Sequence, residues 1–278
     1  MKGSRGEAAK DWVIDVRGLS VERDRPILRE VNWRVRRGEH WAVMGANGSG
    51  KTALLRSVTG YMTASSGEVL VAGGDADEPW ESLRQRVGFV SSNLGQRIEE
   101  DEPVLETVIS GRYSMINYWA RRVRREDREM AREILERVEC SHLEKMPWGV
   151  LSQGERQRVL IGRALMLEEL QLLLLDEPCA GLDPVARERF LRFVERLGEG
   201  SRDEGPTVVL ITHHIEEIIP LFSHVLLLRE GRVVEQGEAG ACLRSGVLSE
   251  VFDARVSVRR RSGRYVLEVE GEDGDAWD

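Results

Sequence analysis

Residues 40–52 read HWAVMGANGSGKT, an apolar stretch followed by a glycine-rich loop that ends in Lys51 and Thr52. Glycine permits backbone angles that side chains disfavour, so consecutive N–H groups of such a loop can point inward at an anion. Lys51 adds a positive charge for the β- and γ-phosphates, and the Thr52 hydroxyl can bind Mg²⁺. The alternative, an ordinary glycine turn between strand and helix, is disfavoured by the full spacing. The predicted phosphate-binding residues are Gly45, Ala46, Asn47, Gly48, Ser49, Gly50, Lys51 and Thr52.

The composition predicts a globular protein. With 278 residues and 41% hydrophobic residues, the chain is long enough for one large domain or two small ones. No apolar run approaches the ~20 residues that span a bilayer, and the first residues lack an apolar signal core, which predicts a cytoplasmic protein. The formal net charge of −8 argues against sequence-independent nucleic-acid binding. Three scattered cysteines, Cys140, Cys179 and Cys242, lack metal-binding spacing and are interpreted as reduced.

The order of apolar patterns predicts an α/β fold. Strands are expected over 12–21, 31–35, 67–71 and 87–90. Those that precede the phosphate loop are expected to form an antiparallel layer. Strands and helices then alternate from about Gly154 to residue 228, which predicts a mainly parallel sheet covered by helices. Two hairpins are expected, with turns at Glu230-Gly231 and Ser262-Gly263. The predicted divisions are a flexible arm over 1–11, a nucleotide-binding core over 12–94 and 151–235, a helical subdomain over 95–150, and a C-terminal extension over 236–278 that ends in an acidic tail.

The region 95–150 interrupts this alternation with a charged, helical pattern. Met130, Ile134 and Val138 recur at i, i+4 and i+8, which predicts one apolar helix face. A basic run over 121–125 follows aromatic residues and is interpreted as a solvated face, with contact to a membrane subunit or lipid headgroups as the alternative. A second basic run, over 259–261, is interpreted as a solvated face.

An acidic pair, Asp176 and Glu177, ends the apolar run 172–175. Beside a phosphate-binding loop, Asp176 can hold Mg²⁺ and Glu177 can polarise the attacking water. The pair could also be a solvated turn, because Asp-Glu-Pro is good turn chemistry. The phosphate loop favours the catalytic interpretation.

Another motif, Ser152-Gln153-Gly154-Glu155, precedes a helical pattern. Ser152 and Glu155 have capping-box spacing, so the motif predicts at least a capped helix. Leu151 to Glu155 followed by Arg-Gln-Arg also resembles the signature sequence of the ABC ATPases. Residues 180–183, Ala-Gly-Leu-Asp, resemble the D-loop of that family, and Thr212-His213 resembles its switch histidine. The ordered motifs span about residues 13–235.

The resemblance implies the ABC type of P-loop NTPase fold: a RecA-like core with an antiparallel β layer and an inserted α-helical subdomain. It also implies two chains, expected to be identical in sequence, paired head to tail around two ATP molecules. Ser152, Gln153, Gly154 and Glu155 of one chain would then face the phosphate loop of the other, with Asp183 nearby. Lys51, Glu177 and His213 would be catalytic, and Thr52 and Asp176 would bind Mg²⁺.

Two positions depart from the family pattern. Ser92 stands where the family usually carries a glutamine that senses Mg²⁺ and couples to the helical subdomain. We expect Ser92 or Asn93 to substitute through a bridging water. The aromatic residue that often stacks on adenine corresponds to Glu22 or Arg23, and the planar guanidinium of Arg23 can stack on a base.

The resemblance implies an ATP-hydrolysing subunit that acts with separate membrane-spanning permease subunits, on the inner face of the membrane. The Ser91-Ser92 pair and the sequence of residues 176–183 resemble those of the subgroup described as iron-complex or molybdate importers. The alternative is a soluble ABC ATPase that drives a cytosolic assembly process.

Overall fold

The computed structural model describes residues 12–74, 78–117, 123–199 and 205–270. The predicted arm over 1–11, the acidic tail after 270 and residues 121 and 122 of the basic run lie outside these ranges. The chain divides into two compact units. One contains residues 1–76 and 209–278, and the other contains residues 77–208.

The first unit begins with an antiparallel three-stranded sheet in the order β2-β1-β4, which confirms the predicted layer. The strands are β1 (Trp12–Glu22), β2 (Pro26–Arg36) and β4 (Ser66–Val71). Val31, Trp33 and Val35 are buried on one face of β2, as the alternation predicts. The strand starts at Pro26, five residues before the predicted start at residue 31. The prediction began too late because Arg29 and Glu30 are both exposed and Glu30 has a φ of 51°, which interrupts the alternation of buried and exposed residues.

A second sheet of this unit carries the phosphate loop. Strand β3 (Trp41–Met44) is parallel to residues 209–212 of β7 (Thr207–Thr212) and to β8 (His224–Arg229). Strand β9 (Arg232–Glu238) returns antiparallel to β8. The turn between them places Glu230 at φ 49° and Gly231 at φ 76°, which confirms the predicted hairpin as a type I′-like turn. All four residues of β3 are buried, as expected for a strand with neighbours on both edges.

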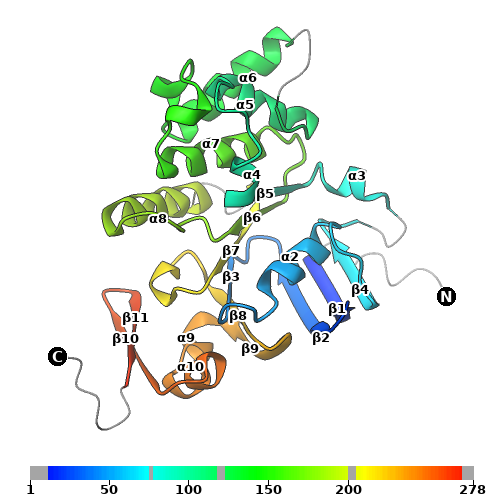
Figure 1. The fold of residues 1–278 in the computed structure, drawn as a ribbon, viewed down its shortest axis with the longest axis vertical. Coiled ribbons are helices and arrows are strands. Elements are labelled where there is room, and N and C mark those ends of the chain that lie inside the picture. The colour runs from blue at the N-terminus through cyan, green and yellow to red at the C-terminus, as the bar shows by residue number, and fades with distance from the viewer. Residues whose placement is uncertain (1–11, 75–77, 118–122, 200–204, 271–278) are drawn as a thin grey trace. The chain divides into compact units, whose positions relative to one another are not determined.

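Aromatic rings and one helix connect these two sheets. Trp33 of β2 meets Trp41 of β3 edge to face, with 6.0 Å between ring centroids, and Trp41 stacks on His224 at 5.0 Å. Helix α2 (Lys51–Val58) follows the phosphate loop and lies against the antiparallel sheet (Figure 1). Its buried residues include Leu54 and Leu55. The loop between β3 and α2 is therefore anchored at both ends in packed structure.

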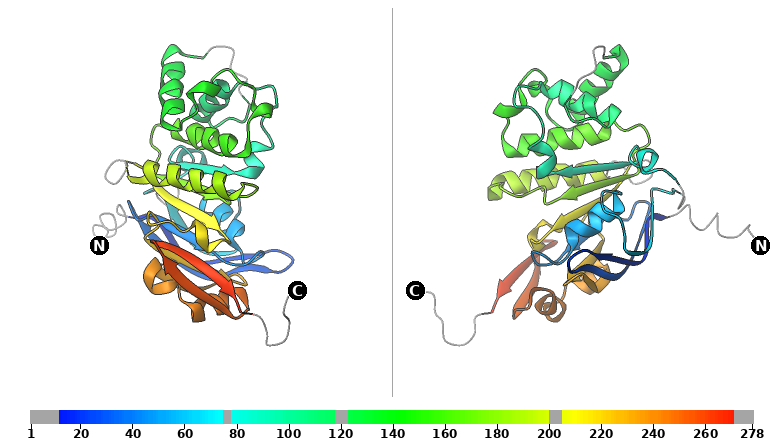
Figure 2. Two further views of the ribbon diagram at one scale, coloured as in Figure 1. Left: turned by 90° about the vertical axis from the view of Figure 1, so that its left-hand side faces the viewer. Right: turned by 45° about the vertical axis from the view of Figure 1, so that its right-hand side comes forward.

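The C-terminal part of the first unit begins after β7. It comprises the 3₁₀ turn η4 (Ile215–Glu217), helices α9 (Ala239–Cys242) and α10 (Ser245–Phe252), and strands β10 (Val256–Arg261) and β11 (Arg264–Val269). Strands β10 and β11 form the predicted second hairpin, the red ribbon of Figure 2, around Ser262 and Gly263. Strand β11 packs against η4, and the Arg264 guanidinium donates to the Glu216 carbonyl at 3.1 Å.

The second unit contains a pair of parallel strands and most of the helices. Strands β5 (Val87–Ser91) and β6 (Leu172–Asp176) pair from Val87 opposite Leu172 to Ser91 opposite Asp176. The helices are α3 (Trp80–Leu83), α4 (Ser92–Gly95), α5 (Val104–Ser110), α6 (Arg125–Arg137), α7 (Gln153–Leu165) and α8 (Pro184–Glu199), with 3₁₀ turns η1 (Gly111–Tyr113), η2 (Ser141–Leu143) and η3 (Trp148–Val150).

Helices α5, α6 and α7 pack on one another (Figure 1). The prediction that Met130 lies on the apolar face of this region is wrong, because Met130 is 39% exposed. The buried face of α6 instead follows Ala131, Ile134 and Leu135 and continues to Val138, the spacing of adjacent helical turns. Over the described ranges, no helix of the chain combines the length and apolarity needed to cross a bilayer.

All three cysteines are buried, and none of them forms a disulfide. Burial raises the pKa of the Cys140 thiol to about 12 and also raises the pKa of Cys242. Because the thiolate is the reactive form, we expect iodoacetamide at pH 8 to leave the three thiols of the folded protein unmodified and to alkylate all three in urea. Mass spectrometry of the intact chain measures both results. Alkylation of folded Cys140 at the rate seen in urea would contradict the prediction.

Candidate functional site

The phosphate loop closes on itself between β3 and α2. The Lys51 ammonium is buried and donates to the carbonyls of Gly45, at 2.8 Å, and Ala46, at 3.1 Å. The N–H of Ser49 donates to Ala46, and the carbonyl of Ser49 accepts from the N–H of Gly231 at 2.9 Å. The loop thus surrounds its own lysine, and the β8–β9 turn holds its far end.

Several features of the loop fit a phosphate group. Gly50 has a φ of 105°, and a Cβ there would lie 2.7 Å from Leu28 Cδ2, so the position requires glycine. The buried Ser49 hydroxyl has no hydrogen-bond partner among the described residues. No side chain caps the N-terminus of α2, and its first turn holds no acidic residue. The positive end of the helix dipole is therefore not neutralised from within the loop. Thr52, in the first turn, is exposed.

His213 leaves the sheet at the same edge as this loop. Thr212 is opposite Met44 in the parallel register of β7 and β3, so His213 and Gly45 follow neighbouring strand ends. The Thr212 hydroxyl donates to the buried Glu217 carboxylate at 2.7 Å and accepts from the His214 N–H at 2.9 Å, which fixes the chain on either side of His213. The half-buried His213 ring lies 4.1 Å from the His214 ring. This unit therefore places Lys51, Thr52 and His213 at one sheet edge.

Arg23, the predicted adenine-stacking residue, follows the end of β1. Its guanidinium donates to the carbonyls of Glu22, at 2.9 Å, and Thr63, at 3.3 Å. These contacts fix the guanidinium of the exposed Arg23 side chain. They do not test whether it stacks on adenine, so the stacking role stays a prediction.

In the second unit, the acidic pair lies at the carboxyl end of β6. Asp176 is the last residue of the strand and is half-buried, as is Glu177. Glu177 has a φ of 48°, a left-handed conformation that is uncommon for glutamate, and its carbonyl accepts from the Ala180 N–H at 3.1 Å. The strained turn redirects the chain immediately after the strand and fixes where the Glu177 side chain leaves it.

Ser92 lies at the same edge of the β5–β6 pair, because Ser91 is opposite Asp176. The Ser91 hydroxyl caps the short helix α4 by accepting from the Leu94 N–H at 3.3 Å. The Ser92 hydroxyl accepts a 3.4 Å hydrogen bond from the amide of Gln157, which is 1% exposed. The side-chain carbonyl oxygen of Gln157 is buried and has no hydrogen-bond partner within the described ranges. Gln157 was not predicted as a site residue, although it follows the Ser-Gln-Gly-Glu motif by two positions.

The motif itself forms the predicted capping box at the start of α7. The Ser152 hydroxyl accepts from the Glu155 N–H, and the Glu155 carboxylate accepts from the Ser152 N–H at 2.8 Å and from the Ser152 hydroxyl at 2.7 Å. Partial burial acts to raise the pKa of Glu155, but the hydrogen bonds from Ser152, with His142 and Arg158 nearby, lower it on balance. Gln153 and Gly154 form the first turn and are half-buried. Ser152 is exposed at the helix N-terminus, where an anion is favoured.

Asp183 caps α8. Its carboxylate accepts from the N–H groups of Val185, at 2.8 Å, and Ala186, at 3.0 Å. Hydrogen bonds from Ala186 and Val185 hold the pKa of Asp183 below its usual value. This structural role is compatible with the predicted D-loop contact, which stays a prediction.

Comparison with known proteins gives the family. The family described as ABC transporter matches residues 28–180. YlmA of Bacillus subtilis (strain 168), an uncharacterized ABC transporter ATP-binding protein, is 36% identical over 258 residues, 92% of this chain and 96% of that protein. The zinc transport system ATP-binding protein TroB of Treponema pallidum (strain Nichols) is 28% identical over 90% of each chain.

Solved structures agree. An inward-facing conformation of a putative metal-chelate type ABC transporter is 26% identical, with a TM-score of 0.74 over 94% of this chain and 97% of that one. The dimeric structure of MJ0796, a bacterial ABC transporter cassette, is 25% identical, with a TM-score of 0.67 over 81% and 98%. The chain therefore belongs to the ABC transporter family, as an ATP-binding subunit whose hydrolysis of ATP is coupled to transport.

Proposed function

We propose that this chain powers a bacterial importer of a metal complex, as one of two identical subunits bound to separate permease subunits on the inner face of the cell membrane. The likeness to a putative metal-chelate type transporter over 94% of the chain carries the proposal. The zinc transport relative supports the same substrate class. Within that class, an iron complex is our candidate. Molybdate is the other substrate named for the subgroup of importers that this sequence resembles. Because molybdate is an oxyanion and not a metal complex, it is compared with the iron complex in the experiment below.

The proposed nucleotide roles are assigned residue by residue. Lys51 and the loop N–H groups bind the β- and γ-phosphates, and His213 contacts the γ-phosphate. Glu177 orients the attacking water and accepts its proton. Thr52 and Asp176 would hold Mg²⁺, which when bound neutralises the phosphate charge. The exposed Thr52 hydroxyl and the half-buried Asp176 carboxylate are the oxygen ligands that this ion prefers.

The dimer supplies what one chain lacks. Ser152 and the first-turn N–H groups of α7 form an exposed helix N-terminus that suits a phosphate. The dimeric cassette related to this chain supports pairing. In the proposed head-to-tail pair, Ser152 and Gly154 of one subunit close over the nucleotide held by Lys51 of the other.

Purification of the tagged full chain from its own membranes tests the transport proposal. We expect a multi-span protein to accompany it in detergent, and the ATPase rate of that complex to rise when a metal-complex-binding partner and its iron complex are added. Recovery only from the soluble fraction, without a membrane protein, would contradict transport and favour a cytosolic assembly ATPase. Stimulation by molybdate instead of iron complexes would contradict the substrate class alone.

The loop after β5 gives a separate prediction. Replacing both Ser92 and Asn93 with alanine removes the proposed water-mediated metal contact and the hydroxyl that accepts from Gln157. We expect the ATPase rate to fall about tenfold and the Mg²⁺ concentration for half-maximal rate to rise, with a small change in thermal stability because Asn93 is exposed and Ser92 is only half-buried. Titration of the rate with Mg²⁺ measures this. An unchanged rate and Mg²⁺ dependence would remove Ser92 and Asn93 from the metal site.

A further inference from the structure

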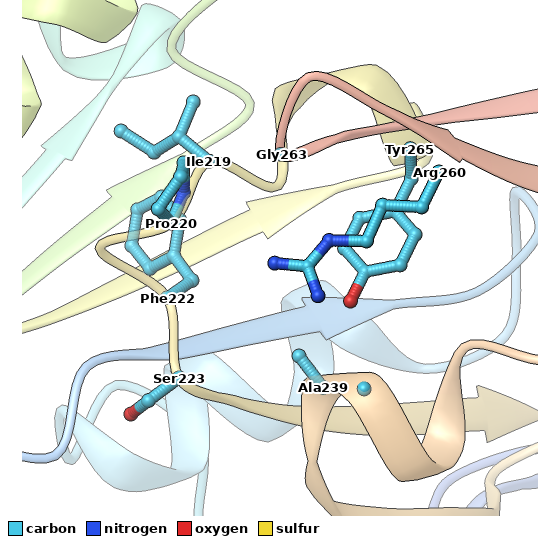
Figure 3. Close-up of a pocket in the computed structure, with 9 residues that line it drawn as sticks. Ile219, Pro220, Phe222, Ser223, Ala239, Arg260, Gly263 and Tyr265 are labelled. Carbon is cyan, nitrogen blue, oxygen red and sulfur yellow. The ribbon is translucent and has the colours of Figure 1, made fainter.

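A small cavity lies in the C-terminal part of the first unit, among segments that the nucleotide roles do not use. Its volume is about 140 Å³. The walls come from the segment 219–223 after η4, from the start of α9, and from the β10–β11 hairpin with its turn (Figure 3). Ile219 and Phe222 are almost fully buried and give one apolar wall. Since a water molecule occupies about 30 Å³ in the liquid, the cavity has room for a small organic molecule.

Two polar side chains of the hairpin point into this cavity. Figure 3 shows the Arg260 guanidinium and the Tyr265 hydroxyl turned toward the same space, with Pro220 and Phe222 opposite. Arg260 lies over the Tyr265 ring, 5.5 Å from its centroid, which holds the guanidinium beside the phenol. Tyr265 is 8% exposed and lines the cavity.

The Arg260 side chain is exposed to solvent, and no protein carboxylate pairs with it within the part of the chain that the structure describes. The ring contact is the only side-chain interaction of Arg260 there, and the Tyr265 hydroxyl has no hydrogen-bond partner. Neighbouring arginines of the hairpin differ. Arg259 pairs with Glu268 at 3.3 Å, and Arg264 donates to the Glu216 carbonyl. The hairpin thus leaves one cation and one hydroxyl directed at an apolar wall.

We infer that this cavity binds a small organic carboxylate with an apolar body. The carboxylate forms a charge-assisted, two-point contact with Arg260 and accepts from the Tyr265 hydroxyl. The apolar body packs on Ile219, Pro220 and Phe222. A compact inorganic anion satisfies the arginine but leaves the apolar wall uncovered, and a neutral molecule covers the wall but leaves the arginine unpaired.

Calorimetric titration of the full chain, at low salt and without nucleotide, tests the inference with benzoate as the probe. We expect saturable binding with a dissociation constant of about 10 mM or tighter, the lower end of efficiency for about nine non-hydrogen atoms. Benzamide, the neutral analogue, and inorganic phosphate should each bind at least tenfold more weakly. Arg260→Gln should weaken benzoate binding at least tenfold, and Tyr265→Phe about threefold.

Arg259→Gln is the matched control, because it removes a charge from the adjacent position of β10 while leaving the cavity intact. It should bind benzoate like the original protein. All three variants should keep their melting temperature and basal ATPase rate, since none belongs to the nucleotide site. Absence of saturable benzoate binding, equal binding of benzamide or phosphate, or unchanged binding by Arg260→Gln would each overturn the inference.

Discussion

Glu177→Gln is expected to lower the rate of ATP hydrolysis at least about 100-fold while leaving ATP binding intact. The substitution keeps the size and hydrogen-bonding shape of the side chain but removes the carboxylate that accepts the proton of the attacking water, a contribution typically of 10²–10⁴. The strained φ of 48° at this position persists with glutamine, so folding is little affected. Phosphate release under saturating ATP measures the rate, and fluorescence of a labelled ATP measures binding.

The same variant should accumulate as an ATP-bound dimer, because hydrolysis opens the proposed pair. Size-exclusion chromatography with and without ATP reports this. Glu188→Gln, which alters an exposed carboxylate of α8 paired with Arg192, is the control and should behave like the original protein in both assays. Hydrolysis by Glu177→Gln at the original rate would end the catalytic assignment, whatever the oligomeric state.

Gly231→Ala should damage the phosphate loop from outside it. Gly231 lies in the β8–β9 turn at a φ of 76°, and an added Cβ would lie 2.2 Å from the Ile27 carbonyl of β2. Its N–H donates to Ser49 of the loop, and its carbonyl accepts from the Arg29 N–H at 2.8 Å. The backbone conformation alone costs about 1–2 kcal/mol with a side chain, and the overlap forces the turn away from Ser49.

We expect Gly231→Ala to bind ATP about tenfold more weakly and to melt about 5 °C or more lower than the original protein, since 1 kcal/mol corresponds to a few degrees at this size. Labelled-ATP fluorescence and calorimetric melting measure the two effects. Gly246→Ala, in α10, is the matched control, because a Cβ there meets nothing within 4 Å and its φ is not positive. Unchanged melting and affinity in Gly231→Ala would show that the turn does not support the loop.

Local patterns were sufficient to predict much of this molecule. The phosphate loop, the capping box at Ser152 and both hairpin turns depend on neighbours within a few residues, so their spacing in the sequence carries the structure. Buried strands such as β3 were predictable from continuous apolar runs. The errors arose where a local period was interrupted, as by the bulge at Glu30, or sampled too coarsely, as when every fourth residue of α6 selected Met130 in place of Ala131.

Contacts between distant segments were not predictable in the same way. Gln157 and Ser92 are 65 positions apart, and no spacing rule connects a buried helix amide to a loop hydroxyl. The cavity at Arg260 draws its walls from segments on both sides of β8 and β9. In the sequence, Arg260 belongs to a run of three arginines that is typical of a solvated face. Only the fold separates it from Arg259, which has a carboxylate partner.

The buried cysteines make this chain convenient for spectroscopy. Since Cys140, Cys179 and Cys242 are enclosed, a thiol introduced at the 60% exposed Val185 would be the preferred target of a spin label without removing any native cysteine. Val185 follows Asp183, the predicted D-loop residue, by two positions. In a symmetric pair, one engineered position supplies two spin labels. Pulsed electron paramagnetic resonance on the Glu177→Gln background can therefore follow subunit closure through the single distance between the two labels.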